Sequence, residues 1–151
     1  MGPANATIHA TAVLTGAKAT LIRGPSGSGK SQLAWGLIEA GMQGLLPFAR
    51  LVADDRVLLE NRSGHLIVRP ARELAGAIEI RGLGIRRTEF EPVAVVGLVV
   101  DLDANDAERL PEQEATAVVL SGVRVPRLAV AAGMPALPLV IAALHIPLVG
   151  D

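Results

Sequence analysis

The stretch that decides the fold of this chain is Gly24-Pro25-Ser26-Gly27-Ser28-Gly29-Lys30-Ser31. It matches the pattern G-x-x-x-x-G-K-[ST] at every fixed position, in which glycines let backbone N–H groups turn inward toward a phosphate. The apolar, β-branched run at residues 19–23 predicts a short buried strand, and residues 32–40 predict a helix that Gly41 ends. A strand, a glycine loop and a helix N-terminus in this order favour the binding of phosphate groups.

Composition strengthens this interpretation. The chain has two lysines against twelve arginines, yet Lys30 stands where the pattern needs a compact ammonium charge. Three of the five serines, Ser26, Ser28 and Ser31, also lie in this loop. The alternative is a glycine-rich turn that matches the pattern by chance, and it leaves the flanking strand and helix unexplained.

The overall composition limits the class of protein. We expect 151 residues, half of them apolar and only 2% aromatic, to form one domain over residues 1–151. A net charge of −1 without a basic run, and few rings for base stacking, argue against a nucleic-acid partner. The chain has no cysteine, which excludes disulfides, thiol catalysis and thiolate metal sites.

The expected use of a nucleotide and the lack of a targeting signal favour a cytoplasmic location. Met1–Thr7 has neither a basic region nor an apolar core, so it does not form a secretion signal. Between Leu128 and Gly150 the only ionisable residue is His145, but Gly133 and three prolines interrupt the apolar run. We therefore expect a buried strand followed by a buried helix or an oligomer interface, and no membrane span.

The spacing of apolar residues and turns predicts an α/β fold with a mixed, strand-rich sheet. Asn61-Arg62-Ser63-Gly64 indicates a hairpin, and residues 135–145 indicate a helix with Pro135 in its first turn. The expected strands are residues 11–14, 19–23, 51–53, 57–60, 65–69, 78–81, 93–100 and 123–130.

Two groups of acids compete for the metal that phosphoryl transfer requires. Asp101 follows the longest apolar strand, whereas Asp54 and Asp55 follow a shorter strand that lies closer to the loop in sequence. The spacing alone does not decide which of the two groups binds the metal. Because adjacent residues of a strand point to opposite faces, we expect at most one of Asp54 and Asp55 to face the phosphates.

Four short motifs follow one another in the chain: residues 9–13 (H-A-T-A-V), the loop at 24–31, residues 52–57 (V-A-D-D-R-V) and residues 79–85 (E-I-R-G-L-G-I). In this order they resemble the catalytic domain of the HPr kinase/phosphorylase family, bacterial enzymes that phosphorylate a serine of the phosphocarrier protein HPr. The last two are the specific ones, and the match runs from about residue 9 to residue 145. The resemblance implies a P-loop kinase fold of the HPr kinase and PEP carboxykinase type, in a short form without the family's N-terminal domain.

The resemblance also implies catalytic roles, and it decides between the acids in favour of the second group. Asp55 is then the base that takes the proton of the substrate serine, and the acid for the reverse step. His9 and Arg109 match further catalytic positions, and Arg109 is suited to offset charge on the transferred phosphoryl group. Lys30 is expected to bind the β- and γ-phosphates. Taken alone, without the flanking motif, His9 is better explained as an ordinary surface or core histidine.

Cofactors and partners follow from the same resemblance. ATP is expected in the loop of residues 24–31, and Mg²⁺ at Ser31, Glu79 and Asp54. The expected protein substrate is an HPr-like phosphocarrier of the phosphotransferase system, and the expected assembly is a homo-oligomer, a hexamer in the family.

The chain departs from the family near its C-terminus. The family carries basic residues for dephosphorylation in the loop before its last helix, whereas Val130–Ala136 has none. The chain also ends soon after that helix, where the family has a further segment that helps to hold HPr. Arg124 and Arg127 are near in sequence, but three positions apart on a strand they point to opposite faces. We therefore expect a competent kinase and a poor phosphorylase.

Two other functions stay open on the same loop. A small-molecule kinase needs a substrate pocket with basic or aromatic groups and a lid, and no arginine-rich lid segment is evident. A nucleotide-binding regulatory module needs no catalytic acid. Phosphate transfer from labelled ATP, with and without a carrier protein, separates these functions from a protein kinase.

Overall fold

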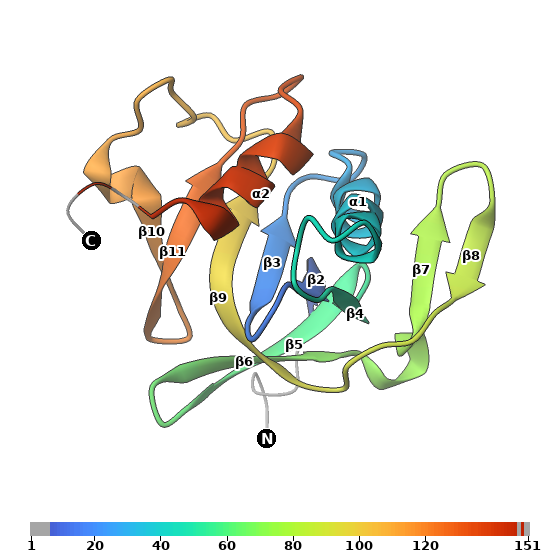
Figure 1. Cartoon of the computed structure of the whole chain (residues 1–151). Coiled ribbons are helices and arrows are strands. Elements are labelled where there is room, and N and C mark those ends of the chain that lie inside the picture. Colours follow the sequence, from blue (N-terminus) through green and yellow to red (C-terminus); the bar gives the residue numbers. More distant parts are fainter. Residues whose placement is uncertain (1–6, 148, 150–151) are drawn as a thin grey trace.

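The computed structural model describes residues 7–147 and residue 149, and it confirms an α/β fold with a mixed, strand-rich sheet (Figure 1). The expectation of no secretion signal at the N-terminus falls largely on residues 1–6, outside the described residues. The helices are α1 (Lys30–Met42) and α2 (Ala136–His145), with 3-10 helices η2 (Arg72–Leu74) and η3 (Gln113–Thr116). The strands are β1 (Ile8–His9), β2 (Thr11–Leu14), β3 (Ala19–Arg23), β4 (Arg50–Ala53), β5 (Arg56–Arg62), β6 (His65–Pro70), β7 (Ala77–Ile80), β8 (Gly84–Arg87), β9 (Ala94–Asp101), β10 (Ala117–Leu120) and β11 (Val123–Ala129).

The curved strand β9 is the centre of the main sheet. The strand order is β1-β5-β6-β9-β3-β2-β4, and β11 also joins β9, with β10 beside it. The start of β9 pairs with β6 and its end with β11, while β3 runs along its other edge. β3 and β11 are both parallel to β9, so the loops that follow these three strands leave the sheet at one edge. Ligands of open α/β sheets bind at that kind of edge.

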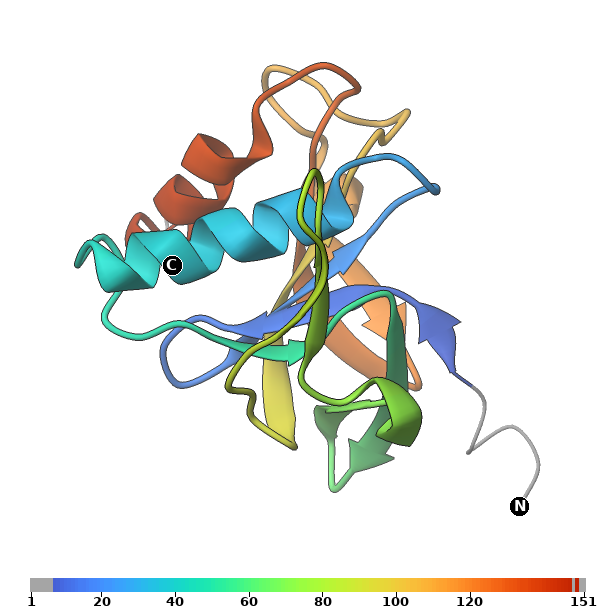
Figure 2. The same cartoon turned by 90° about the vertical axis from the view of Figure 1, so that its right-hand side faces the viewer.

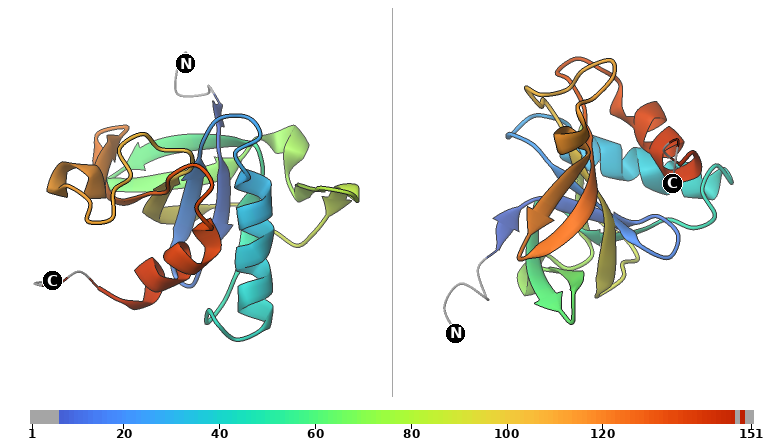
Figure 3. Two further views of the ribbon diagram at one scale, coloured as in Figure 1. Left: turned by 90° about the horizontal axis from the view of Figure 1, so that it is seen from above. Right: turned by 90° about the vertical axis from the view of Figure 1, so that its left-hand side faces the viewer.

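Alternating side chains of the central strands fill two apolar cores, one on each face of the sheet. Ile22 of β3 and Val100 of β9 pack with the helices, whereas their neighbours Leu21 and Val99 pack with side chains of β5 and β6. Both helices lie on the first face (Figures 2 and 3). The second face is covered by strands, because the sheet curls back through β5 and β6. This explains why the chain has so many strands for two helices.

The prediction that Gly41 ends the first helix was wrong, because α1 continues to Met42. A Cβ atom at position 41 would lie 2.7 Å from the Cβ of Ala49, a distance that packed atoms do not reach. The glycine thus allows the returning chain to pass close to the helix. The helix ends one residue later, where the N–H of Gln43 donates to the carbonyl of Glu39.

The apolar stretch from residue 128 contains the predicted strand and helix, with β11 followed by the ten-residue helix α2. Among the described residues, no helix has the length and apolar character needed to cross a membrane. The prediction of a buried helix holds only in part, because Val140 is the single fully buried residue of α2 and Ile146 after it is 69% exposed. An oligomer interface at this helix stays a prediction.

Asp101, at the end of β9, forms ion pairs with arginines of the two neighbouring strands. Arg23 of β3 donates from Nε and Nη2 to its two carboxylate oxygens, at 2.7 and 2.8 Å, and Arg127 of β11 donates from Nε. Arg127 also donates to Asp106, at 2.8 and 3.0 Å. Burial alone would raise the pKa of the Asp101 carboxyl, but the hydrogen bonds and charges of the two arginines outweigh it and hold that pKa below its ordinary value. The cluster ties β3, β9 and β11 together behind the phosphate loop.

Replacing Asp101 by Asn is expected to lower the free energy of unfolding at pH 7 by about 2 kcal/mol. The value is below the ~3–5 kcal/mol of a fully buried pair, since the amide oxygen still accepts one hydrogen bond. The folded carboxyl has the lowered pKa, so its stabilisation is complete above the unfolded pKa of about 4 and is lost as the pH falls through the folded pKa. Thermal unfolding followed by circular dichroism at pH 7 and pH 3 should therefore show a smaller loss of Tm for Asp101→Asn than for the wild type.

Asp103→Asn is the matched control for this experiment. Asp103 is exposed, forms no ion pair with the described residues, and has a φ of +53° that asparagine also tolerates. An acid-induced loss of Tm that is equal in Asp101→Asn and the wild type would contradict the role assigned to the cluster.

Candidate active site

The loop of residues 24–29 joins β3 to α1 and has the geometry of a phosphate cradle. Gly27 and Gly29 have φ angles of +82° and +99°, in the left-handed region that glycine adopts without strain. No side chain caps α1, and its first hydrogen bond runs from Leu33 N–H to the carbonyl of Gly29, at 2.9 Å. The N–H groups of the first turn of α1 therefore have no acceptor within the helix. Helix N-termini with such free N–H groups bind anions.

Two polar side chains of the loop fit a polyphosphate. Lys30 Nζ lies over the loop and donates to the carbonyls of Gly24 and Pro25, at 2.9 and 3.3 Å. The Ser28 hydroxyl is buried and has no hydrogen-bond partner among the described residues. A buried hydroxyl without a partner is costly, and phosphate oxygens in the loop would supply acceptors.

Asp54 connects the loop to the strands. Its side chain is only 6% exposed and accepts three hydrogen bonds. Ser31 Oγ and Thr11 Oγ1 donate to Oδ1, at 2.6 and 3.0 Å, and the backbone N–H of Glu79 donates to Oδ2, at 3.0 Å. The first acid of the pair therefore contacts Ser31 of the loop motif directly, whereas the carboxylate of Asp101 is engaged by Arg23 and Arg127.

The Ser31–Asp54 contact suits Mg²⁺. This ion usually takes one or two carboxylates and fills its other positions with phosphate oxygens and water. The described part of the chain contains no cluster of three or more acids or histidines that could hold a metal ion. Ser31 and Asp54 together fit an ion that the phosphates help to hold.

Asp55 adopts an uncommon backbone conformation at the turn between β4 and β5. Its φ is +71°, in the left-handed region that Asp enters more readily than most residues with a side chain, and its surroundings hold it there. The surroundings are two hydrogen bonds: its N–H donates to Thr11 Oγ1 at 3.1 Å, and its carbonyl accepts from Ala10 N–H at 3.2 Å. Its side chain is 61% exposed, with Oδ1 3.8 Å from Nδ1 of His9. The turn thus presents this carboxylate to solvent.

Of the predicted site residues, the structure brings together Lys30, Ser31, Asp54, Asp55 and His9. Two others are not joined to them through their side chains. The backbone of Glu79 contacts Asp54, but its side chain is exposed. Arg109 is exposed in the segment between β9 and η3, and no hydrogen bond or ion pair links it to the loop among the described residues. The roles of both stay predictions.

Thr11 is the residue that sequence reasoning missed. It is fully buried in β2, and its hydroxyl donates to Asp54 and accepts from the N–H of Asp55. One hydroxyl therefore orients both members of the acid pair. The available signal was a lone polar residue between alanines in an apolar strand, two positions after His9.

Comparisons with known proteins identify the family of this chain. The family model "HPr Serine kinase C-terminal domain" matches residues 4–144. An HPr kinase/phosphorylase of Geobacillus thermodenitrificans is 35% identical over 135 residues, which cover 82% of this chain and 41% of that protein. One from Clostridium beijerinckii is 40% identical over 78 residues, covering 52% of this chain and 24% of the relative. The aligned parts are thus less than half the length of these relatives.

A solved structure supports the fold independently. The Hpr(Ser) kinase/phosphatase from Coxiella burnetii superposes with a TM-score of 0.74 at 22% identity, covering 93% of this chain and 89% of that chain. The likeness in structure thus extends over nearly the whole chain, and the family model matches nearly the same residues. The chain therefore belongs to the HPr serine kinase C-terminal domain family.

Proposed function

We propose that this chain is an ATP- and Mg²⁺-dependent protein-serine kinase, and that its substrate is a serine of an HPr-like phosphocarrier. One observation carries the proposal: a continuous line of contacts runs from Ser31 through Asp54, Thr11 and Asp55 to His9. It joins a hydroxyl and a carboxylate beside the phosphate loop, which would suit an ion, to an exposed carboxylate a short distance away. Those are the parts that phosphoryl transfer to a hydroxyl group requires.

Each residue then has a distinct role. Lys30, which now donates to the loop carbonyls, would donate to phosphate oxygens instead, and Ser31 and Asp54 would hold the ion that offsets the phosphate charge. The hydroxyl oxygen of the substrate serine bonds to the γ-phosphorus of ATP, and Asp55 accepts the hydroxyl proton. The bond between that phosphorus and the oxygen that stays on ADP breaks. Bound ATP supplies the phosphoryl group. His9, 3.8 Å from Asp55, is positioned to orient that carboxylate or share its proton.

The openness of the acceptor side favours a protein substrate over a small molecule. Asp55 and His9 side chains are 61% and 65% exposed, whereas a small acceptor would need walls that exclude water around it. A regulatory module without catalysis needs no exposed carboxylate beside the phosphate loop, whereas a protein kinase uses one as its base. We also propose that the protein acts in the cytoplasm, as a homo-oligomer.

The direct test is transfer of labelled phosphate from ATP, with and without purified HPr-like carriers. Labelled carrier that is lost when its acceptor serine is replaced by alanine supports the proposal. Label in a small-molecule fraction would indicate the small-molecule kinase. ATP binding without transfer to any carrier would indicate the regulatory module.

Lys30→Ala is expected to weaken ATP binding by about one to two orders of magnitude, because a charge-assisted contact worth ~1.5–3 kcal/mol is lost. Isothermal titration calorimetry with MgATP measures this. Lys18→Ala is the matched control, since Lys18 is the other lysine of the chain and is exposed. Equal affinity of Lys30→Ala and the wild type would refute the phosphate-loop assignment.

Asp55→Asn is expected to reduce serine phosphorylation by about 100-fold or more and to leave ATP affinity nearly unaltered. A general base contributes about 10²–10⁴-fold and acts on the acceptor, not on the nucleotide, while asparagine still accepts the positive φ. Asp54→Asn is the contrasting variant and should lose Mg²⁺-dependent ATP binding. If Asp101→Asn were folded but inactive and Asp55→Asn were active, the catalytic acid would be Asp101 at the end of β9, and our assignment to Asp55 after β4 would be wrong.

The reverse reaction, from phosphoserine and inorganic phosphate, is expected to be slow relative to the kinase reaction. Two anions must then be held close together, and their repulsion needs cationic groups. The segment 130–136 has none, and the Arg127 guanidinium is engaged by Asp101, Asp106 and the carbonyl of Ala115. Pyrophosphate release from serine-phosphorylated carrier, Mg²⁺ and phosphate tests this. Equal forward and reverse rates would show that the basic loop is dispensable.

A further inference from the structure

Thr11 lies where the pairing of β2 with β4 ends and the chain opposite it turns into β5. Its neighbour Ala12 pairs with Ala53, the last residue of β4. On the other edge of β2, Thr11 pairs with Ile22 of β3, the strand that leads into the phosphate loop. The sheet therefore fixes the backbone of Thr11, and its side chain reaches the acidic turn between β4 and β5.

The direction of the two hydrogen bonds at the Thr11 hydroxyl is determined by its partners. A backbone N–H can only donate and a carboxylate can only accept. The hydroxyl therefore accepts from Asp55 N–H at 3.1 Å and donates to Asp54 Oδ1 at 3.0 Å. Because Thr11 is fully buried, solvent water does not reach this position to replace the hydroxyl. One buried oxygen thus joins the two acids at fixed distances.

The position of the Asp55 carboxylate depends more on its backbone than on side-chain contacts. In the described part of the chain, the only ion pair or hydrogen bond of this side chain is its 3.8 Å approach to His9. Two hydrogen bonds tie the turn itself to β2 and the residue before it. They are the bond from Asp55 N–H to Thr11 and the bond from Ala10 N–H to the Asp55 carbonyl. Without the Thr11 hydroxyl, one of these two bonds is lost.

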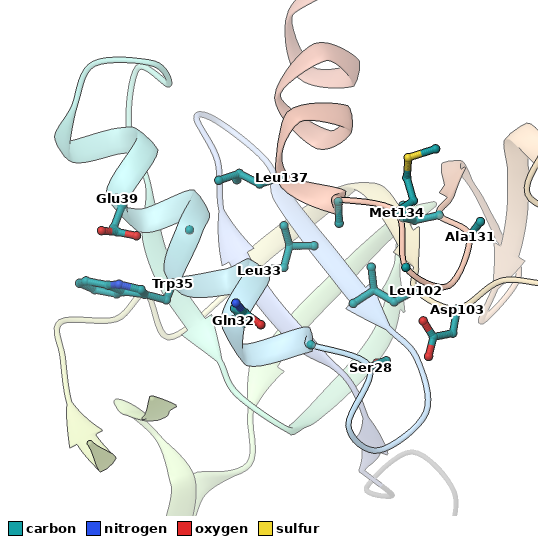
Figure 4. Close-up of a pocket in the computed structure, with 15 residues that line it drawn as sticks. Ser28, Gln32, Leu33, Trp35, Glu39, Leu102, Asp103, Ala131, Met134 and Leu137 are labelled. Atoms are coloured by element: carbon teal, nitrogen blue, oxygen red, sulfur yellow. The ribbon is translucent and has the colours of Figure 1, made fainter. Parts of the chain in front are cut away.

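Thr11 is also separate from the pocket of about 520 Å³ that adjoins the phosphate loop at Ser28 (Figure 4). The sheet order places β2 and β4 beside one edge of β3 and β9 beside the other. The pocket is lined on the β9 side by Leu102 and Asp103, and Thr11 and Asp54 are not part of its lining. A change at Thr11 therefore leaves the loop and this pocket intact.

We propose that Thr11 is a positioning residue for phosphoryl transfer, whose hydroxyl fixes the base Asp55 relative to the ion site at Asp54. Transfer requires that the reacting atoms lie about 3–3.5 Å apart and in line. The ion places the phosphate and the base places the acceptor hydroxyl, so an oxygen bonded to both acids sets donor and acceptor relative to each other. The inference rests on the proposed function, because it takes Asp54 as an ion ligand and Asp55 as the base.

Thr11→Val tests the hydroxyl, since valine has nearly the same shape and lacks it. We expect kcat for carrier phosphorylation to fall about 10- to 100-fold, the size of loss that a misplacement of about 1 Å causes. The KM for ATP should change by less than about twofold, because the loop and the pocket are intact. Thr11→Ser keeps the hydroxyl and should retain most of the wild-type kcat.

Thr20→Val is the matched control. Thr20 is also fully buried in the same sheet, and its hydroxyl shares a hydrogen bond of 2.9 Å with Thr15 Oγ1. It lies near the start of β3, whereas the phosphate loop follows the end of that strand. This variant should leave kcat unaltered. An equal loss of kcat in Thr20→Val and Thr11→Val would indicate a general loosening of the sheet and would overturn the proposal.

A double-mutant cycle identifies the residue through which Thr11 acts. In the Asp55→Asn background, Thr11→Val should lower the residual kcat by less than about threefold, because no base remains to be misplaced. The same loss in both backgrounds would show that Thr11 acts independently of Asp55, which would refute the inference.

Hydrogen exchange at Asp55 N–H tests the positioning without an assay of phosphate transfer. In the wild type, Thr11→Ser and Thr20→Val, this amide should exchange at least about tenfold more slowly than in an unstructured peptide, and Thr11→Val should lose the protection. An unprotected Asp55 amide in the wild type would overturn the proposal. A protected amide in a protein that phosphorylates no carrier would refute the proposed function and leave the hydrogen-bonding role of Thr11 standing.

Discussion

The buried carboxylate of Asp54 is the contact on which the arrangement of the site depends. A charge that is 6% exposed is stable only when hydrogen bonds replace its lost water, and its three donors come from α1, β2 and β7. β7 and β8 form a separate two-stranded sheet that projects from the main one (Figure 1). The bond from Glu79 N–H thus ties this hairpin to the phosphate loop through a single side chain.

The neighbouring carboxylate, that of Asp55, is exposed to solvent, whereas that of Asp54 is buried. The reason for this difference is not the alternation of side chains along a strand that we expected. Alternation along a strand predicted that only one of Asp54 and Asp55 would face the loop, and the contacts of Asp54 agree. However, the strand does not continue through the pair. It breaks between β4 and β5, and the positive φ of Asp55 turns its carboxylate outward. Thr11 stabilises this turn, so the buried and exposed acids share one support.

Features encoded by adjacent residues could be predicted from the sequence. The phosphate loop, the hairpin at residues 61–64 and strands β2, β3 and β9 were placed within one or two residues, since apolar runs and turn residues define them locally. β8 was missed because its four residues are exposed and lack alternation. The Arg23–Asp101 and Thr11–Asp54 pairs are 78 and 43 residues apart, and no local pattern reports such contacts.

The distribution of cations around the loop follows from the same long-range contacts. Arg23 and Arg127 lie at the ends of strands that lead to the site edge, where free guanidinium groups would attract any anion. Asp101 and Asp106 neutralise them, and their hydrogen bonds raise the pKa of Arg127 further above its ordinary value. At the loop itself, the attraction for phosphate is therefore supplied by Lys30 and by the N–H groups of the loop and helix, which are fixed in direction. The ion pairs that join the strands thus also favour anion binding in the loop, because the positive charges of Arg23 and Arg127 are already paired within the sheet.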